Sequence, residues 1–210
     1  MASTFKGTVE ITHICTATAI LSINGINMLT DPFFSSAGTT RRATPAVVLE
    51  NTESPAMALH NLPVIDAILP SHENHFDNLD DLGRQLLDGR RESIDTVIAG
   101  KPFQITATPC VHFPGHERPE TDDLPNAIYF SGDTIHLPEL AEMRRKFHIT
   151  IALFNIGAAF ITMGRKQAAH LFRDIGADIL GKEGLRSEFE AAGIIDQVRW
   201  LEPGVTQRIV

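Results

Sequence analysis

The sequence has few of the residues that hold small secreted proteins together. Only two of its 210 residues are cysteines, Cys15 and Cys110, and two cysteines give no disulfide framework. Residues 1–7 contain no apolar stretch of the kind that forms the centre of a secretory signal. We therefore expect a cytoplasmic protein.

Long apolar runs and clusters of positive charge are also missing. The apolar runs fall well short of the ~20 residues that a membrane-spanning helix requires. Lys and Arg number 18 against 26 Asp and Glu, which gives a net charge of −8. A nucleic-acid partner usually requires a basic surface. We therefore expect neither a nucleic-acid partner nor a membrane.

What the sequence does contain suits one globular domain. Hydrophobic residues make up 43% of the chain and charged residues 21%, which is typical of a folded soluble protein. A chain of 210 residues is long enough to bury a substantial core. Because no repeat, linker or low-complexity segment interrupts it, we expect a single domain over residues 1–210.

Apolar periodicity predicts strands first, and then strands that alternate with helices. An Asn24-Gly25 turn is expected between two of the early strands. The predicted strands cover residues 9–14, 17–23, 26–30, 64–70, 95–99, 103–107, 126–130, 149–154, 177–180 and 198–201. Helices are predicted at 79–87, 137–147, 166–175 and 182–192, and residues 34–63 are expected to be a long surface excursion. This order predicts an α/β fold with sheets packed between helices.

One polar segment carries most of the chemistry. The apolar run 64–70, predicted as a buried strand, is followed by Ser71-His72-Glu73-Asn74-His75-Phe76-Asp77-Asn78-Leu79-Asp80. Loops at the end of a rigid sheet commonly hold reacting groups. His and Asp supply the nitrogen and oxygen ligands that Zn²⁺ and similar ions accept. The alternative is a polar loop in which His72 is a structural cap and Asp77 caps the next helix.

This segment resembles the HxHxDH metal-binding signature of the metallo-β-lactamase superfamily. It is most similar to a branch of small cytosolic hydrolases whose loop reads roughly SHDxHxDNLD. Residues 11–18 with 29–33 resemble the opening hairpin of the family, 108–112 its middle histidine motif, and 129–134 its bridging-aspartate motif. The resemblance covers most of the chain. It implies an αββα sandwich, in which two mixed β-sheets pack between helices.

The resemblance also implies a metal site. Its expected ligands are His72, His75, Asp77, His112 and Asp133. The bound metal would lower the pKa of a water toward ~7 and so generate hydroxide at neutral pH. Asp77 is the expected catalytic residue, which would orient this hydroxide and pass a proton to the leaving group. Zn²⁺ is the expected ion, with Mn²⁺ or Fe as alternatives because His and Asp ligands accept all three.

Several of these residues have simpler structural interpretations. His112 is also compatible with a strand-end histidine bound to a backbone carbonyl, and Asp133 with an Asx-turn. His13 and Asp31 match the opening motif of the family and are expected either to orient metal ligands or to be buried structural groups. His116 is assigned to the substrate mouth, with an ordinary loop position as the alternative.

Two departures from the family pattern bear on a second metal. Asn78, a poor ligand, stands where the pattern has a histidine. No histidine follows the late strand 177–180, where the family usually has its last metal ligand, and this region looks shortened. We therefore expect one tightly bound ion rather than two.

The function that the resemblance implies is metal-dependent hydrolysis. The expected substrate is a small molecule with an amide, lactam, lactone or other ester bond. A catalytically weakened or non-catalytic binding protein of the same fold is one alternative, supported by the absent late histidine. A phosphodiesterase is the other, although the quoted motifs contain no Arg or Lys to bind a phosphate.

Overall fold

The computed structural model describes residues 7–44, 47–71, 79–84, 95–105, 124–156, 163–177, 179–181, 186–199 and 201–210. The chain divides into two compact units. One unit consists of Gly7–Ile105 and Glu202–Val210, and the other of Met1–Lys6 and Thr106–Leu201. Folding of residues 1–210 as a single domain stays a prediction. No helix in the described ranges combines the length and the apolar character needed to cross a membrane.

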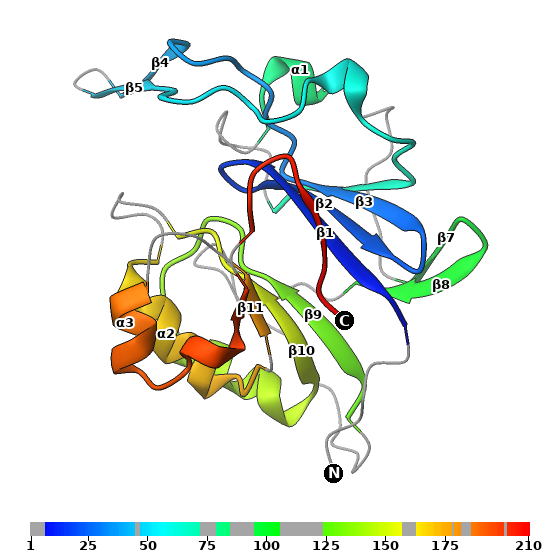
Figure 1. Ribbon diagram of the computed structural model, residues 1–210, viewed down its shortest axis with the longest axis vertical. Helices are drawn as coiled ribbons and strands as arrows, with labels where there is room; N and C mark the ends of the chain where they lie inside the picture. The colour runs from blue at the N-terminus through cyan, green and yellow to red at the C-terminus, as the bar shows by residue number, and fades with distance from the viewer. Residues whose placement is uncertain are drawn as a thin grey trace. The chain divides into compact units, whose positions relative to one another are not determined.

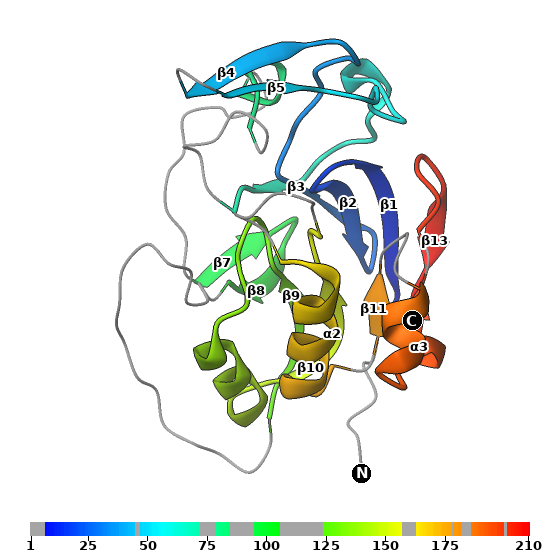
Figure 2. The same ribbon diagram turned by 90° about the vertical axis from the view of Figure 1, so that its left-hand side faces the viewer.

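A five-stranded sheet forms the centre of the first unit (Figures 1 and 2). Its strands are β1 (Val9–Cys15), β2 (Thr18–Ile23), β3 (Ile26–Thr30), β6 (Ala67–Leu69) and β13 (Thr206–Arg208), in the spatial order β13-β1-β2-β3-β6. β3 and β6 are parallel, whereas the other neighbours are antiparallel, so this sheet is mixed. The predicted strands at 9–14, 17–23 and 26–30 are confirmed. β13 is an additional strand that the sequence did not predict.

The turn between β2 and β3 explains the register of that hairpin. Asn24 has φ 52° and Gly25 φ 80°, both in the left-handed region that a two-residue type I′ turn requires. Ile23 therefore pairs with Ile26, and Leu21 with Met28. This turn had been predicted from the Asn-Gly pair.

The surface excursion predicted for residues 34–63 contains regular structure. β4 (Thr40–Thr44) and β5 (Val47–Glu50) form an antiparallel hairpin, and η1 (Leu59–Asn61) is a short 3₁₀ helix. Val48 is 54% exposed and Leu49 40% exposed, so neither face of the hairpin shows the apolar alternation that predicts a strand. The sequence predicted a surface excursion at 34–63 but none of these elements within it.

The predicted strand 64–70 is shorter and less buried than expected. Only β6 is extended, its three residues are half-buried, and Val64 is 82% exposed. β6 comes last in the described strand order, and an edge strand is not covered on both sides. The following helix α1 (Asp81–Arg84) begins two residues later than the predicted helix.

Two apolar clusters support the first sheet. One consists of Ile14, Ile20, Leu29 and Phe34, with Met57, Leu59, Leu62 and Ile65 packed against it. The other consists of Ile26, Met28 and Ile98. Ile98 belongs to the hairpin of β7 (Asp95–Ile98) and β8 (Lys101–Gln104), whose pairing was predicted although β8 begins earlier than expected.

The second unit is built on a four-stranded parallel sheet. Its strands are β9 (Asn126–Phe130), β10 (His148–Leu153), β11 (Ile179–Gly181) and β12 (Val198–Arg199), in the order β12-β11-β10-β9. The sequence predicted two mixed sheets. The five-stranded sheet is mixed, whereas the described strands of this one all run in the same direction.

Helices connect these strands and cover one face of the sheet (Figures 1 and 2). They are η2 (Pro138–Arg145), α2 (Arg165–Asp174), α3 (Arg186–Ala191) and η3 (Ile195–Gln197). Ala168, Leu171 and Phe172 follow helical spacing in α2 and are buried against Tyr129 and Phe154 in one core cluster. The helix predicted at 137–147 is a 3₁₀ helix, which Pro138 opens.

Candidate functional site

The structure describes three of the residues assigned to the site. His13 and Asp31 lie in the first unit, and Asp133 lies in the second. The other assigned residues, His72, His75, Asp77, Asn78, His112 and His116, lie outside the described residues. Within the described ranges, no three His, Cys, Asp or Glu side chains gather in a way that could hold a metal ion. The metal-ligand set therefore stays a prediction.

Asp31 is a buried carboxylate that holds the residue directly before His72. It follows β3, is 0% exposed and has φ 30°. The backbone N–H of Ser71 donates to Asp31 Oδ1 at 2.5 Å, and Ser71 Oγ donates to Oδ2 at 2.8 Å. Both carboxylate oxygens are thus used to fix Ser71. These bonds act directly before residues 72–78, which we call the histidine segment, and both roles expected for Asp31 stay predictions.

Thr18 fixes the backbone that presents the Asp31 carboxylate. Its Oγ1 donates to the Asp31 carbonyl at 2.6 Å and accepts from the Phe33 N–H at 3.1 Å. Thr18 is 0% exposed, so no water competes for these bonds. The left-handed backbone of Asp31 is therefore held from both sides, which is what a strained conformation requires.

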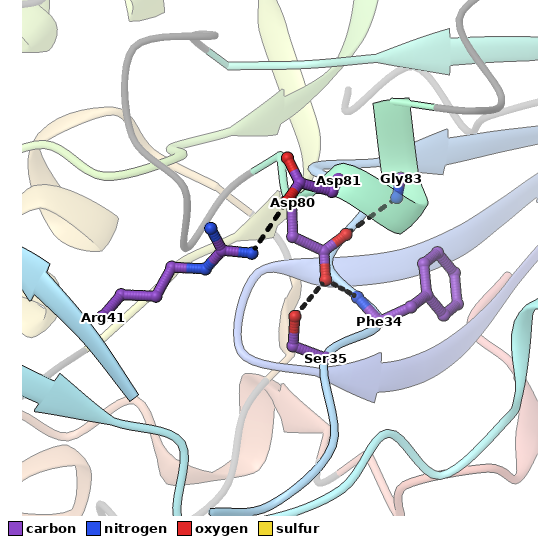
Figure 3. A network of polar contacts seen from close by, with 6 residues as sticks. All are labelled: Phe34, Ser35, Arg41, Asp80, Asp81 and Gly83. Carbon is purple, nitrogen blue, oxygen red and sulfur yellow. Dashed lines mark hydrogen bonds and ion pairs between the residues drawn. The ribbon is translucent and has the colours of Figure 1, made fainter. Parts of the chain in front are cut away.

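Asp80 performs the corresponding role after the histidine segment (Figure 3). It is 1% exposed, and its Oδ2 accepts from the Phe34 N–H at 2.8 Å and from Ser35 Oγ at 2.6 Å. Its Oδ1 accepts from the Gly83 N–H at 2.7 Å and so caps α1. The capping role that the sequence left open for Asp77 thus belongs to Asp80.

The two anchors share one short stretch of chain, residues 31–35. Asp31 provides the carboxylate for Ser71, whereas Phe34 and Ser35 provide the donors for Asp80. The first turn of α1 also approaches this stretch closely. A Cβ atom added at Gly83 would lie 1.9 Å from the Pro32 carbonyl oxygen, so only glycine fits there.

Asp133 lies beyond the carboxyl end of β9. Asn155, beyond the end of the neighbouring strand β10, donates a side-chain hydrogen bond from Nδ2 to Asp133 Oδ1. The Asn155 N–H also donates to Ser131 Oγ at 2.9 Å. The carboxyl ends of parallel strands are where ligands bind in open α/β sheets. The half-buried Asp133 is therefore an oriented oxygen donor at the edge where a ligand is expected.

His13 makes a local contact within its own hairpin. Its Nε2 lies 3.1 Å from the Thr16 carbonyl oxygen, and the ring is half-buried. Thr16 has φ 38°, so this contact forms at the tight turn between β1 and β2. Both roles expected for His13 stay predictions.

Cys15 carries a half-buried thiol. Its Sγ donates to the Phe33 carbonyl at 3.1 Å, and burial raises the pKa of the thiol to about 11. Because the thiolate is the nucleophile, a raised pKa disfavours the reactive form of this side chain at neutral pH.

The sequence analysis did not predict three of the residues that hold the described part of the site. Asp80 had a usable signal, since an aspartate directly before a helix commonly caps it. Ser71 and Asn155 gave weaker signals, because their partners Asp31 and Asp133 are 40 and 22 residues away. Only the tertiary fold brings such pairs together.

Comparison with solved structures identifies the fold. An isothiocyanate hydrolase from Delia radicum gut bacteria superposes with a TM-score of 0.69 at 16% identity, covering 94% of this chain and 98% of that one. A possible metal-dependent hydrolase from Veillonella parvula gives 0.64 at 18% identity, covering 96% and 100%. Igni18, a novel metallo hydrolase from Ignicoccus hospitalis, gives 0.63 at 16% identity, covering 97% and 99%. No family model and no curated protein matches the sequence.

These likenesses confirm the predicted α/β fold class. The chain shares its fold with these three structures, and the sequence resemblance is confirmed at the level of the fold alone.

Proposed function

We propose that this protein is a metal-dependent hydrolase that cleaves a small molecule with an amide, lactam, lactone or other ester bond. One observation carries the proposal. The histidine segment 72–78 is bracketed by two buried carboxylates, Asp31 and Asp80, in a fold shared with metallo-hydrolases. Buried carboxylates with every oxygen in use are costly to build. This cost is understandable where a segment must be held in one place.

The proposed ligands fit a transition metal by chemistry. His72, His75 and His112 would supply nitrogens and Asp133 an oxygen, a donor set that Zn²⁺ accepts, with Mn²⁺ or Fe as alternatives. When bound, the metal would supply a hydroxide and polarise the attacked carbonyl. Asn155 fixes the orientation of the Asp133 carboxylate, as partners of metal ligands commonly do. Asp77 is assigned to the transfer of a proton to the leaving group.

The substrate class can be narrowed by a panel of electrophiles. One of the similar structures is named an isothiocyanate hydrolase. An isothiocyanate has an electrophilic carbon, as amides, lactams, lactones and esters do, so the hydroxide that a bound metal would supply suits all of them. A panel of these five classes therefore covers the proposed chemistry.

The test combines metal content with turnover. Purified protein is analysed for metals per chain and then assayed on the panel before and after chelation, with Zn²⁺ or Mn²⁺ added back. We expect chelation to abolish turnover and the metal to restore it. His75→Ala and His112→Ala should lower metal content and turnover together. His60→Ala, at an exposed position in η1, is the matched control and should change neither.

Two outcomes would contradict the proposal in different ways. Full turnover after chelation would exclude a metal mechanism. Stoichiometric metal without turnover of any panel member would favour the alternative, a binding protein of this fold that has lost catalysis. The absence of any histidine after His170 is the observation that favours this alternative.

A further inference from the structure

We propose that Asp80 is a positioning residue that sets the metal affinity of the site. It would do so by fixing the end of the histidine segment opposite to the end that Asp31 fixes. The inference rests on the proposed function, because the segment it positions is the one assigned to metal binding. Asp80 itself is assigned no contact with metal or substrate.

The first step of the argument is the use that the fold makes of the Asp80 carboxylate. Three donors converge on it, the backbone N–H groups of Phe34 and Gly83 and the hydroxyl of Ser35, at 2.6–2.8 Å. Helix capping alone requires only the bond from Gly83. The two bonds from Phe34 and Ser35 attach residue 80 to a stretch that lies 45 positions earlier in the chain.

The second step is that the same stretch fixes both ends of the segment. Asp31 binds Ser71 through both carboxylate oxygens, and Phe34 and Ser35 bind Asp80. Residues 71 and 80 are therefore both hydrogen-bonded to one stretch of five residues, rather than to two separate elements. A metal site gains affinity when its ligands are held near their bound positions, because less ordering remains to be done on binding.

The third step is a contrast with the neighbouring aspartate. Asp81 makes an ion pair with Arg41 at 3.2 Å, and its side chain is 80% exposed (Figure 3). An exposed ion pair of this kind contributes little. Asp80 and Asp81 are thus adjacent carboxylates, one buried and one exposed. The same substitution at Asp81 is therefore the control for the substitution at Asp80.

Asp80→Asn tests the proposal. An amide has one acceptor oxygen, so it cannot accept from both sides of the former carboxylate, and at least one attachment is lost. We expect the affinity for Zn²⁺, measured by competition with a chromophoric chelator, to fall about 10-fold, the lower end for groups that orient metal ligands. Asp81→Asn should change it by less than about 2-fold.

A second control separates positioning from general stability. The hydroxyls of Thr12 and Thr206 lie 2.7 Å apart, between β1 and β13, and hold neither end of the segment. Thr206→Val should lower the thermal midpoint and leave the Zn²⁺ affinity unchanged. If Asp80→Asn does not fold, Ser35→Ala serves instead, because it removes one donor and leaves the Phe34 N–H in place. We then expect an intermediate loss of about 3-fold in affinity.

The outcomes distinguish this inference from the proposed function. A folded Asp80→Asn variant that binds Zn²⁺ as tightly as Asp81→Asn would overturn the positioning role. If the unmodified protein binds no metal, the proposed function fails. The positioning role is then read from hydrogen exchange of peptides spanning residues 71–80 in the metal-free protein. Faster exchange in Asp80→Asn than in Asp81→Asn would support it, and equal exchange would refute it.

Discussion

Asn155 donates a side-chain hydrogen bond to Asp133 across the ends of two parallel strands, β9 and β10. The same asparagine binds Ser131 through its backbone N–H, so its own position is fixed at the sheet. The bond leaves Asp133 oriented at the strand ends. Asn155 therefore orients, from the neighbouring strand end, the carboxylate that we assign to the metal.

Asn155→Ala should weaken metal binding. Asp133 would lose the donor that orients it, and removal of such a partner typically costs about 10- to 100-fold in metal affinity or activity. Zn²⁺ competition with a chelator measures the loss. Asn126→Ala is the matched control, because Asn126 lies at the opposite end of β9 and binds His148 at 2.8 Å. Equal losses in both variants would show that Asn155 has no special role.

Gly83→Ala should destabilise the first unit strongly. The added Cβ would lie 1.9 Å from the Pro32 carbonyl oxygen, and a backbone oxygen cannot rotate away as a side chain can. We expect the free energy of unfolding to fall by about 3 kcal/mol, the upper part of the usual range for overpacking. Gly164→Ser is the control, because a Cβ atom added there would lie 3.8 Å from its nearest neighbour, Gln167 Oε1. This variant should leave the free energy of unfolding unchanged or raise it slightly. Urea denaturation compares the two, and equal stability would show that α1 can shift freely.

The stability of the protein should fall at alkaline pH partly because of Cys15. Burial raises the pKa of its thiol from 9.0 to about 11, so the unfolded thiol ionises first. The contribution of Cys15 to stability is therefore complete below pH 9.0 and is lost as the pH rises through about 11. Serine replaces the S–H donor of Cys15 with an O–H donor and does not titrate in this pH range. Cys15→Ser should show a smaller loss between these pH values in urea denaturation, and an identical loss would contradict the assignment.

The protein should bind at most one metal ion tightly per chain. Without a late histidine, and with Asn78 in place of a histidine, a second site would have mainly the carboxylates of Asp77 and Asp133. Carboxylates alone hold a transition metal less firmly than sets that include imidazole. Elemental analysis after dialysis measures the stoichiometry. Insertion of a histidine-bearing loop after Leu180 should raise it, whereas two ions in the unmodified protein would show that another residue completes the site.

Local sequence patterns were sufficient to predict those strands and helices whose apolar residues recur at regular spacing. The strands Ile26–Thr30 and Asn126–Phe130 have the predicted bounds, and the predicted helix 166–175 corresponds to Arg165–Asp174. Each of these segments packs apolar side chains into a core cluster, so its pattern can be read from neighbours in the sequence. The family resemblance rested on short motifs of the same local kind.

Tertiary structure decided the elements whose partners are distant. The strand Thr206–Arg208 exists because it pairs with Val9–Cys15 at the other end of the chain, and its own three residues carry no apolar pattern. The hairpin of β4 and β5 was missed because its apolar residues Val48 and Leu49 are exposed.

The candidate site shows the same division. The sequence determined which residue types are available for a metal, and it placed His72 and His75 between a strand and a helix. It did not determine that Asp31 and Asp80 hold the two ends of that segment from one stretch of backbone. Those hydrogen bonds join residues 40 to 46 positions apart, and such contacts become favourable only after the loops between them have closed. The physical reason is that a carboxylate can bond to many donors in the unfolded chain and to water. Folding and burial remove the competing water and leave only the donors that the tertiary structure places beside it.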